Sequence, residues 1–332
     1  MDIFWPLDLS TTLFFQSLGS WLIIPMKFFS VLGIEEFYTL ALPLLYWCVD
    51  AVIGLRIGSM LLISTNFYGL LKRLFAAPRP FWLDSRVQAH ITETSFGFPS
   101  GHAQNAASIW GLAANQFKRR WFTLLTLLLI LLIGLSRVFL GVHGISQVVA
   151  GWLSGALLLL AYLRWQPGLM RWFLRQGQPT QYLLILASSA TLILIPGLVN
   201  IFNPNWVLPA AWQANASLAD AELVLDPFNP EGLFSVGGTW LGMFGGALWF
   251  YHRYGIFNTS GHLGMRVLRY LIGLVGVVVL WYGLGSVLPD TIDLAGLGLR
   301  YLRYTLVGLW VSALAPLVFL RLRVAAPPQP NQ

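Results

Sequence analysis

Three short stretches of the sequence carry side chains that together could hold and transfer a phosphoryl group. They are Lys72 with Arg79-Pro80, then Pro99-Ser100-Gly101-His102, then Ser136-Arg137 with His143 and Gln147. Three cations could neutralise phosphate oxygens, and arginine adds bidentate geometry. A serine hydroxyl and free backbone amides at the start of a helix would face the same anion.

The motifs contain no pair of carboxylates at the spacing of metal ligands. Asp84 and Glu93 stand alone between the first two motifs, which disfavours metal-assisted hydrolysis. We therefore expect no metal ion and no cofactor. One histidine as nucleophile and a second as general acid would give a phosphohistidine route.

Outside these stretches the chain is strongly apolar. Of its 332 residues, 57% are hydrophobic and 10% are charged, which indicates a polytopic membrane protein. The net charge of +7 does not point to nucleic acid, because the basic residues lie at the ends of apolar segments. Cys48 is the single cysteine, so an intramolecular disulfide is excluded. The first ten residues contain no basic side chain, so we expect no cleavable signal peptide.

The apolar segments predict an all-α bundle with about nine transmembrane helices. A span needs roughly 20 helical residues. The nine segments are 36–54, 56–73, 100–117, 121–140, 144–164, 181–201, 237–252, 267–288 and 300–320. Residues 9–32 are apolar but are interrupted by Gly19, Pro25 and Lys27, which favours helices lying in the membrane interface. A tenth span is the alternative.

The distribution of basic residues predicts the orientation of these spans. If the spans alternate, most arginines and lysines outside the motifs fall on one side, which is then cytoplasmic. The N-terminus and all three motifs then lie on the extracytoplasmic face. We expect a bacterial inner membrane or the endoplasmic reticulum, with the site facing the periplasm, the exterior or the lumen.

We divide the chain into four parts. Residues 1–35 form interfacial helices, 36–164 a catalytic five-span bundle, 165–324 a four-span extension with an outer loop at 202–236, and 325–332 a short tail. Gly151 and Gly155 form a pair of small residues four apart, which favours tight packing within the chain.

The motifs resemble the three signatures of the type 2 phosphatidic acid phosphatase superfamily, which includes lipid phosphatases and vanadium haloperoxidases. The resemblance rests on Lys72 followed after six residues by Arg79-Pro80, on Pro99 to His102, and on Ser136-Arg137 followed after five residues by His143. Most members have aspartate where this chain has Gln147. Glutamine at that place is similar to the glucose-6-phosphatase-like branch. The resemblance is dense over residues 72–155 and thin beyond residue 180.

This resemblance implies a role for each motif residue. His143 would be the nucleophile, and His102 the acid that protonates the leaving oxygen and then the base that activates water. The transferring group would be held by Lys72, Arg79, Ser100, Gly101 and Arg137. Gln147 follows His143 by four residues, so on a helix its amide would orient the imidazole without adding charge.

Three functions remain open from the sequence. The first is a metal-independent phosphatase acting on a lipid phosphate or a sugar phosphate such as glucose 6-phosphate. The second is a phosphotransferase or polyprenyl pyrophosphate phosphatase using the same residues. The third is a non-catalytic phosphate-binding or transport protein. Expected partners are the phosphorylated lipid or sugar and the membrane lipids, without nucleic acid; the oligomeric state is left open.

Overall fold

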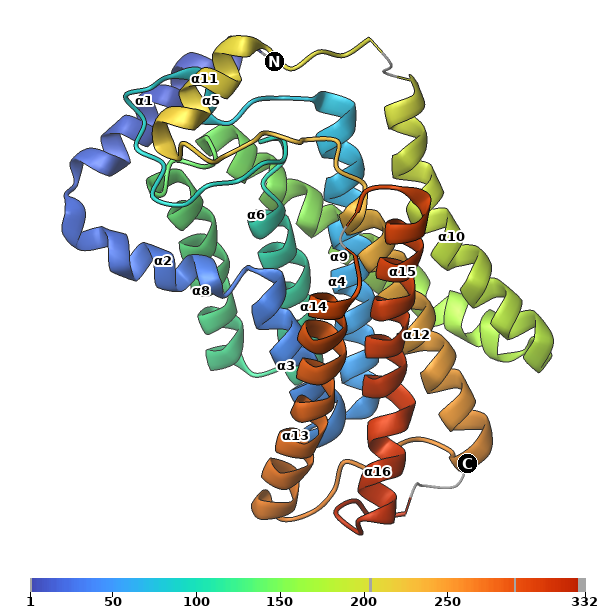
Figure 1. Cartoon of the computed structure of the whole chain (residues 1–332). Helices are drawn as coiled ribbons and strands as arrows, with labels where there is room; N and C mark the ends of the chain where they lie inside the picture. The colour runs from blue at the N-terminus through green and yellow to red at the C-terminus, as the bar shows by residue number, and fades with distance from the viewer. Residues whose placement is uncertain (1, 203–204, 290, 328–332) are drawn as a thin grey trace. The chain divides into compact units, whose positions relative to one another are not determined.

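The computed structural model describes residues 2–202, 205–289 and 291–327, which form helices and loops with no β-strand within those ranges (Figure 1). This confirms the predicted all-α class. Of the tail expected at 325–332, the part beyond Pro327 lies outside the described residues.

Each of the nine segments predicted to span the membrane coincides with helical structure. Six of the segments are single helices: α3 (Glu35–Cys48), α4 (Ala51–Phe75), α8 (Arg120–Phe139), α9 (Ile145–Leu174), α10 (Gln178–Phe202) and α12 (Glu231–Tyr254). The other three each consist of two α-helices joined by a π-helical turn. They are α6 (Gly101–Asn105) and α7 (Gly111–Phe117) joined by Ala106–Trp110, α13 (Leu263–Val278) and α14 (Leu284–Val287) joined by Val279–Gly283, and α15 (Leu294–Leu309) and α16 (Ala315–Arg321) joined by Trp310–Leu314.

Seven of the described helices are long and apolar enough to cross a membrane, and up to eight if a bent pair counts as one span. That pair joins Ser20–Val31 to Glu36–Cys48 at an angle of 47°. The count of nine is therefore not confirmed. Two of the nine predicted spans are missing from the seven because they are short. Helix α3 has 14 residues, and the helical stretch over residues 101–117 also stays below the roughly 20 residues that a span needs.

The N-terminal segment forms two helices, α1 (Trp5–Ser17) and α2 (Ile23–Val31), with a short 3₁₀ turn at Ser20–Leu22 between them. The chain turns at Gly19, whose φ of +113° is a conformation that favours glycine. Both α1 and α2 pack against α8. Their position in the membrane interface stays a prediction.

The described chain separates into two compact units. The first unit comprises the described residues within 2–37, 63–166, 196–202 and 205–229, and it contains all three motifs. The second comprises those within 38–62, 167–195, 230–289 and 291–327, and within it α12 packs along α15. Most of the outer loop expected at 202–236 lies in the first unit, and residues 38–62, expected in the catalytic bundle, lie in the second. The division expected from the sequence stays a prediction.

An aromatic cluster joins that outer segment to the first motif. Helix α11 (Ala210–Ala219) packs on α5 (Pro80–Leu83), the short helix that begins directly after Arg79. The rings in contact are those of Trp82, Phe96, Trp206, Trp212 and Phe228, and the Asn215 side-chain amide donates to the Trp82 carbonyl at 3.0 Å. The cluster fixes the position of α5 and thereby of the backbone at Arg79.

Two glycines of α9 allow α6 to approach closely. A Cβ at Gly151 would lie 2.5 Å from the Ser100 carbonyl oxygen, and a Cβ at Gly155 would lie 2.4 Å from the Gln104 carbonyl oxygen. The pair therefore packs within the chain, as the sequence predicts. This contact sets the distance between the second motif on α6 and the start of α9.

We predict that Gly151→Ala and Gly168→Ala, both in α9, change stability in opposite directions. No atom of another part of the described chain lies within 4 Å of a Cβ at Gly168, so alanine there should stabilise the helix by about 0.5–1 kcal/mol. Alanine at Gly151 meets backbone and should cost about 1–3 kcal/mol. Thermal unfolding in detergent measures both, and equal shifts in the midpoint would contradict the packing described.

Candidate active site

The third motif forms one rigid turn between α8 and α9. The chain reverses at Gly141, whose φ is +79°, a value that favours glycine. The backbone amides of Val142 and His143 both donate to the Arg137 carbonyl, at 3.3 and 3.2 Å. Arg137 and His143 are thus held in a fixed relation although five residues separate them.

The partners of His143 define which ring nitrogen carries the proton. Nδ1 lies 2.8 Å from the Gly97 carbonyl oxygen and 3.1 Å from Oε1 of Gln147, and both of these atoms are acceptors. Nε2 lies 3.1 Å from Nη1 of Arg79, which is a donor. The hydrogen therefore belongs on Nδ1, and Nε2 presents a lone pair.

The electrostatic surroundings of His143 favour its neutral form. The side chain is 1% exposed. Burial, together with the charges of Arg79 and Arg137, lowers the pKa of His143 well below its ordinary value. The imidazole is thus uncharged at neutral pH, the state required of a nucleophile.

Gln147 connects His143 to two other parts of the site. Its Oε1 also accepts from the Gly144 amide at 3.3 Å, and its Nε2 donates to the Pro78 carbonyl at 2.8 Å. A Cβ at Gly97 would lie 2.7 Å from both amide atoms of Gln147, so only glycine leaves room for this arrangement. The amide oxygen orients Nδ1, as its position four residues after His143 predicts, while the nitrogen holds the loop before Arg79.

Arg79 and Arg137 are buried side by side, with exposures of 0% and 1%. Arg79 donates from Nε to the Ser95 carbonyl at 2.6 Å and from Nη1 to the Val142 carbonyl at 2.9 Å. Arg137 donates from Nη1 to the Ser30 hydroxyl at the end of α2. Main-chain and hydroxyl oxygens thus orient both guanidinium groups.

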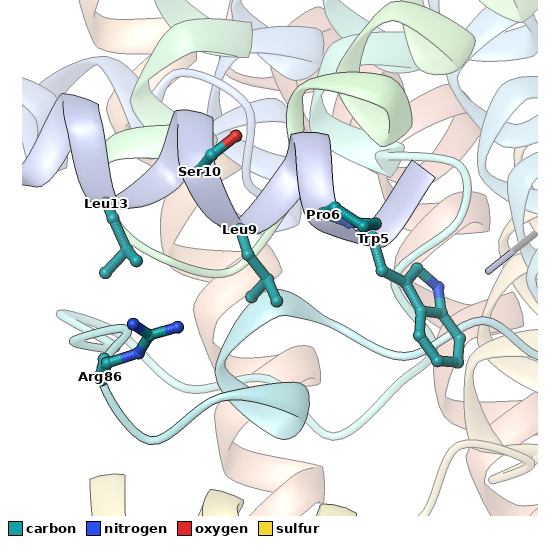
Figure 2. A pocket seen from close by; sticks show the side chains of 6 residues that line it. All are labelled: Trp5, Pro6, Leu9, Ser10, Leu13 and Arg86. Carbon is teal, nitrogen blue, oxygen red and sulfur yellow. The ribbon is translucent and has the colours of Figure 1, made fainter. Parts of the chain in front are cut away.

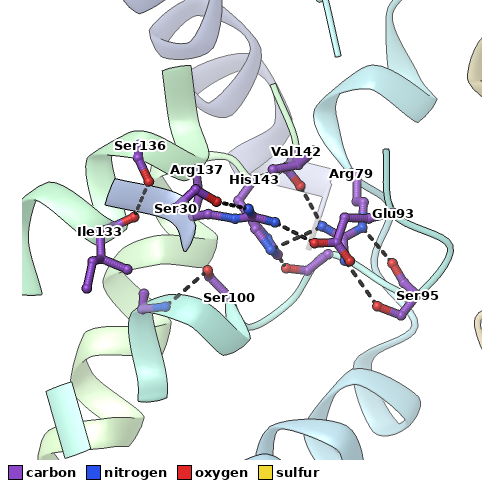
Figure 3. Close-up of polar contacts among 12 residues, drawn as sticks. Ser30, Arg79, Glu93, Ser95, Ser100, Ile133, Ser136, Arg137, Val142 and His143 are labelled. Atoms are coloured by element: carbon purple, nitrogen blue, oxygen red, sulfur yellow. Dashed lines mark hydrogen bonds and ion pairs between the residues drawn. The ribbon is translucent and has the colours of Figure 1, made fainter. Parts of the chain in front are cut away.

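Glu93 bridges the two arginines, as Figure 3 shows. Arg137 Nη2 donates to one carboxylate oxygen, and Arg79 Nη2 lies 3.6 Å from the other. The sequence presents Glu93 only as a carboxylate without a second carboxylate at metal-ligand spacing, and it does not predict these ion pairs. No motif spacing in the sequence identifies Glu93 as a site residue. The one available signal is the position of Glu93 between two cationic motifs.

Ser95, which the sequence analysis missed, is the meeting point of two cations. Its hydroxyl oxygen accepts from Lys72 Nζ at 2.8 Å and from Arg79 Nη2 at 3.1 Å. Lys72 also lies over the Tyr68 ring, 5.4 Å from its centroid. The three predicted cations therefore meet around the loop segment that carries Glu93 and Ser95.

The second motif contributes a helix cap and a histidine with a free nitrogen. The Ser100 hydroxyl accepts from the Ala103 amide at 3.4 Å, so it caps α6, and the Ser100 amide donates to the Gln147 carbonyl at 2.9 Å. Nε2 of His102 is buried and has no hydrogen-bond partner among the residues that the structure describes. Gly33 leaves room for this ring, since a Cβ there would lie 2.8 Å from its Cδ2 atom.

A carboxylate from the N-terminal helix holds the start of α9. Asp8 is 3% exposed and accepts from the Ser146 amide at 2.8 Å and from the Ser146 hydroxyl at 2.6 Å. A negative charge at this helix start is favourable. Helix α1, expected only to lie in the interface, therefore also braces the turn that carries His143.

A pocket apart from these residues lies along α1 (Figure 2). Its lining consists of Trp5, Pro6, Leu9, Ser10, Leu13 and Arg86. The Arg86 guanidinium pairs with Asp84 at 2.6 Å. This pocket contains no motif residue and is not the candidate phosphate site. Across the described ranges, no three His, Cys, Asp or Glu side chains gather in a way that could hold a metal ion.

Comparison with known families gives two matches along the chain. Residues 53–171 match the PAP2 superfamily, and residues 234–327 match the transmembrane extension of PAP2 superfamily phosphatases. The first match contains all three motifs.

Several curated proteins are similar to part of the chain. A dihydrosphingosine 1-phosphate phosphatase of Schizosaccharomyces pombe is 28% identical over 161 residues, covering 44% of this chain and 38% of that protein. Phosphatidylglycerophosphatase B of Bacillus subtilis is 35% identical over 78 residues, covering 20% and 38%. Sphingosine-1-phosphate phosphatase 2 of Mus musculus is 27% identical over 151 residues, covering 42% and 41%. The chain thus spans about two fifths of the length of these relatives.

One solved structure is also similar. It is the crystal structure of a transmembrane PAP2 type phosphatidylglycerolphosphate phosphatase from Bacillus subtilis, with a TM-score of 0.42 and 23% sequence identity. The match covers 48% of this chain and 85% of that one.

We predict that Gln147→Ala lowers kcat for a phosphate monoester by about 10–100-fold, the usual cost of losing a group that orients a reacting histidine. KM should change less than threefold, because none of the described hydrogen bonds of the Gln147 side chain is made to Lys72, Arg79 or Arg137. Steady-state phosphate release measures both constants. Gln176→Ala is the control, since that side chain bonds only the Trp172 carbonyl among its described hydrogen bonds. An unchanged kcat in Gln147→Ala would refute the orienting role.

Proposed function

Because the chain belongs to the PAP2 superfamily, we propose that it is an integral-membrane phosphatase that hydrolyses phosphate monoesters at the site around His143. The observation that carries this proposal is the arrangement of the imidazole. Its Nδ1 hydrogen is directed to Gly97 and Gln147, and its Nε2 lone pair faces Arg79.

In the first step, Nε2 of His143 attacks phosphorus and the bond from phosphorus to the alcohol oxygen breaks. His102 would take up a proton when the negatively charged substrate binds beside it, and it gives this proton to the leaving oxygen. The absence of a hydrogen-bond partner at its buried Nε2 supports this role, since that atom is available to a substrate oxygen. The products of this step are the free alcohol and a phosphohistidine.

In the second step, water attacks the phosphohistidine and His102 takes a proton from that water. The phosphorus–nitrogen bond breaks, His143 returns to its neutral form, and inorganic phosphate is released. No external acid or base is consumed over the two steps.

The transferring group would be held by the three cations. Lys72, Arg79 and Arg137 meet around Ser95 and Glu93, and their donors are oriented by main-chain and hydroxyl oxygens. Such preorganised charge stabilises the equatorial oxygens of the transition state. On substrate binding, a phosphate oxygen would replace Nε2 of His143 as the acceptor of Arg79 Nη1, while Nη1 keeps its bond to the Val142 carbonyl, and the lone pair of Nε2 is freed.

We propose a phosphorylated lipid as the substrate class. The relatives are named for dihydrosphingosine 1-phosphate, sphingosine-1-phosphate and phosphatidylglycerophosphate. A protein embedded in the bilayer meets such substrates at the membrane surface. We further propose that the site faces the extracytoplasmic side, on the basis of the charge asymmetry of the loops. The glucose-6-phosphatase-like branch, inferred from Gln147, stays a prediction.

The decisive experiment measures phosphate release by the detergent-solubilised protein with EDTA present. We expect hydrolysis of dihydrosphingosine 1-phosphate, phosphatidylglycerophosphate or phosphatidate at least tenfold faster than of glucose 6-phosphate. His143→Ala should lose at least a thousandfold in rate, because the nucleophile is gone.

His262→Ala serves as the matched histidine control, since its side chain is exposed and belongs to the second unit. Native rates in His143→Ala would refute the mechanism. Equal or faster release from glucose 6-phosphate would refute the lipid substrate class.

A further inference from the structure

Glu93 occupies the place in the site where an anion is expected to bind. Its carboxylate lies between Arg137 and Arg79, the two arginines that the proposed mechanism assigns to the phosphoryl group (Figure 3). A carboxylate and a phosphate use the same donors of a guanidinium group. Glu93 and a bound phosphate therefore compete for the positive charge of the same two guanidinium groups.

The carboxylate stays ionised in this position. Burial raises the pKa of Glu93, but the positive charges of Arg79 and Arg137 outweigh it and hold the pKa well below its usual range. The ion pairs are therefore intact at any pH at which the protein would work.

Glu93 differs from its partners in its access to water. Its side chain is 29% exposed, whereas those of the two arginines are 0% and 1% exposed. It lies on the loop between α5 and α6, two residues before Ser95, and not within a helix. A displaced carboxylate can thus turn toward solvent while the arginines remain fixed by Ser95, Val142 and Ser30.

The charge balance of the site explains how a displaceable carboxylate could assist turnover. Arg79 and Arg137 contribute two positive charges beside a neutral His143, and Lys72 lies next to them on Ser95. Hydrolysis converts the bound monoester into inorganic phosphate, which is itself an anion and contacts the same cations. Buried cations without a counterion would hold this product tightly and slow the next turnover.

We propose that Glu93 is an internal competing anion that re-forms its pairs with Arg79 and Arg137 as inorganic phosphate leaves, and thereby promotes product release. This inference rests on the proposed phosphatase function. It predicts that loss of Glu93 changes the affinity for phosphate in one direction, whereas a purely structural role of Glu93 predicts the other direction. If Glu93 only braced the arginines, its loss would weaken phosphate binding; as a competitor, its loss strengthens it.

The test is equilibrium binding of inorganic phosphate to the purified full chain in detergent, by isothermal titration calorimetry. In Glu93→Gln, which keeps the shape and removes the charge, the Kd for phosphate should fall about tenfold or more relative to the unchanged chain. Glu93→Asp retains the charge and should stay within about threefold. Glu222→Gln, an exposed carboxylate of the outer segment, should leave Kd unchanged.

Glu93→Ala provides a second neutral variant if Glu93→Gln does not purify, and the same direction of change is expected. In turnover, phosphate should become a stronger product inhibitor and kcat should fall in the neutral variants. An unchanged or weaker affinity for phosphate in a folded neutral variant overturns the proposal. Phosphate binding needs no hydrolysis, so a chain that binds phosphate but cleaves no monoester would refute the proposed function while this comparison still decides the role of Glu93.

Discussion

The burial of two arginine side chains in one small volume is the constraint on which the rest of the first unit depends. Removing a guanidinium group from water is costly unless its donors find acceptors and its charge finds a counterion. Arg79 and Arg137 meet most of this demand with the Ser95 and Val142 carbonyls, the Ser30 hydroxyl and the Glu93 carboxylate, while Nε of Arg137 finds no acceptor among the described residues. The loop between α5 and α6, the end of α2 and the turn after α8 must therefore converge on one point.

The histidine turn is positioned by the same convergence. Gln147 reaches the Pro78 carbonyl only because Gly97 leaves space, and Asp8 from α1 holds the start of α9. Aromatic contacts between α11 and α5 then fix the segment that carries Arg79. Elements far apart in the sequence thus position the single imidazole of His143. The protonation state of this ring follows from its hydrogen-bond partners.

Much of this site could be predicted from the sequence, because motif residues lie at spacings that helices and turns convert directly into proximity. Gln147 four residues after His143 is such a case, although His143 lies in the turn just before α9 and not on the helix itself, and the Gly151 and Gly155 pair is another. Glu93, Ser95, Ser30 and Asp8 could not be predicted, because each acts across a long sequence separation with no repeating pattern. The all-α class follows from composition, but the number of spans does not, since the third segment is long enough to be helical and too short to be an unambiguous span.

The proposed mechanism depends on covalent transfer of the phosphoryl group to Nε2 of His143. The most direct measurement is an alkaline quench of the enzyme within the first turnover of a ³²P-labelled lipid monoester, followed by identification of the labelled amino acid. We expect acid-labile, base-stable label on His143, with more of it in His102→Ala when the substrate has a good leaving group, since water attack then lacks its base. Full hydrolytic activity with no label on histidine, or label that persists in His143→Ala, would contradict the account.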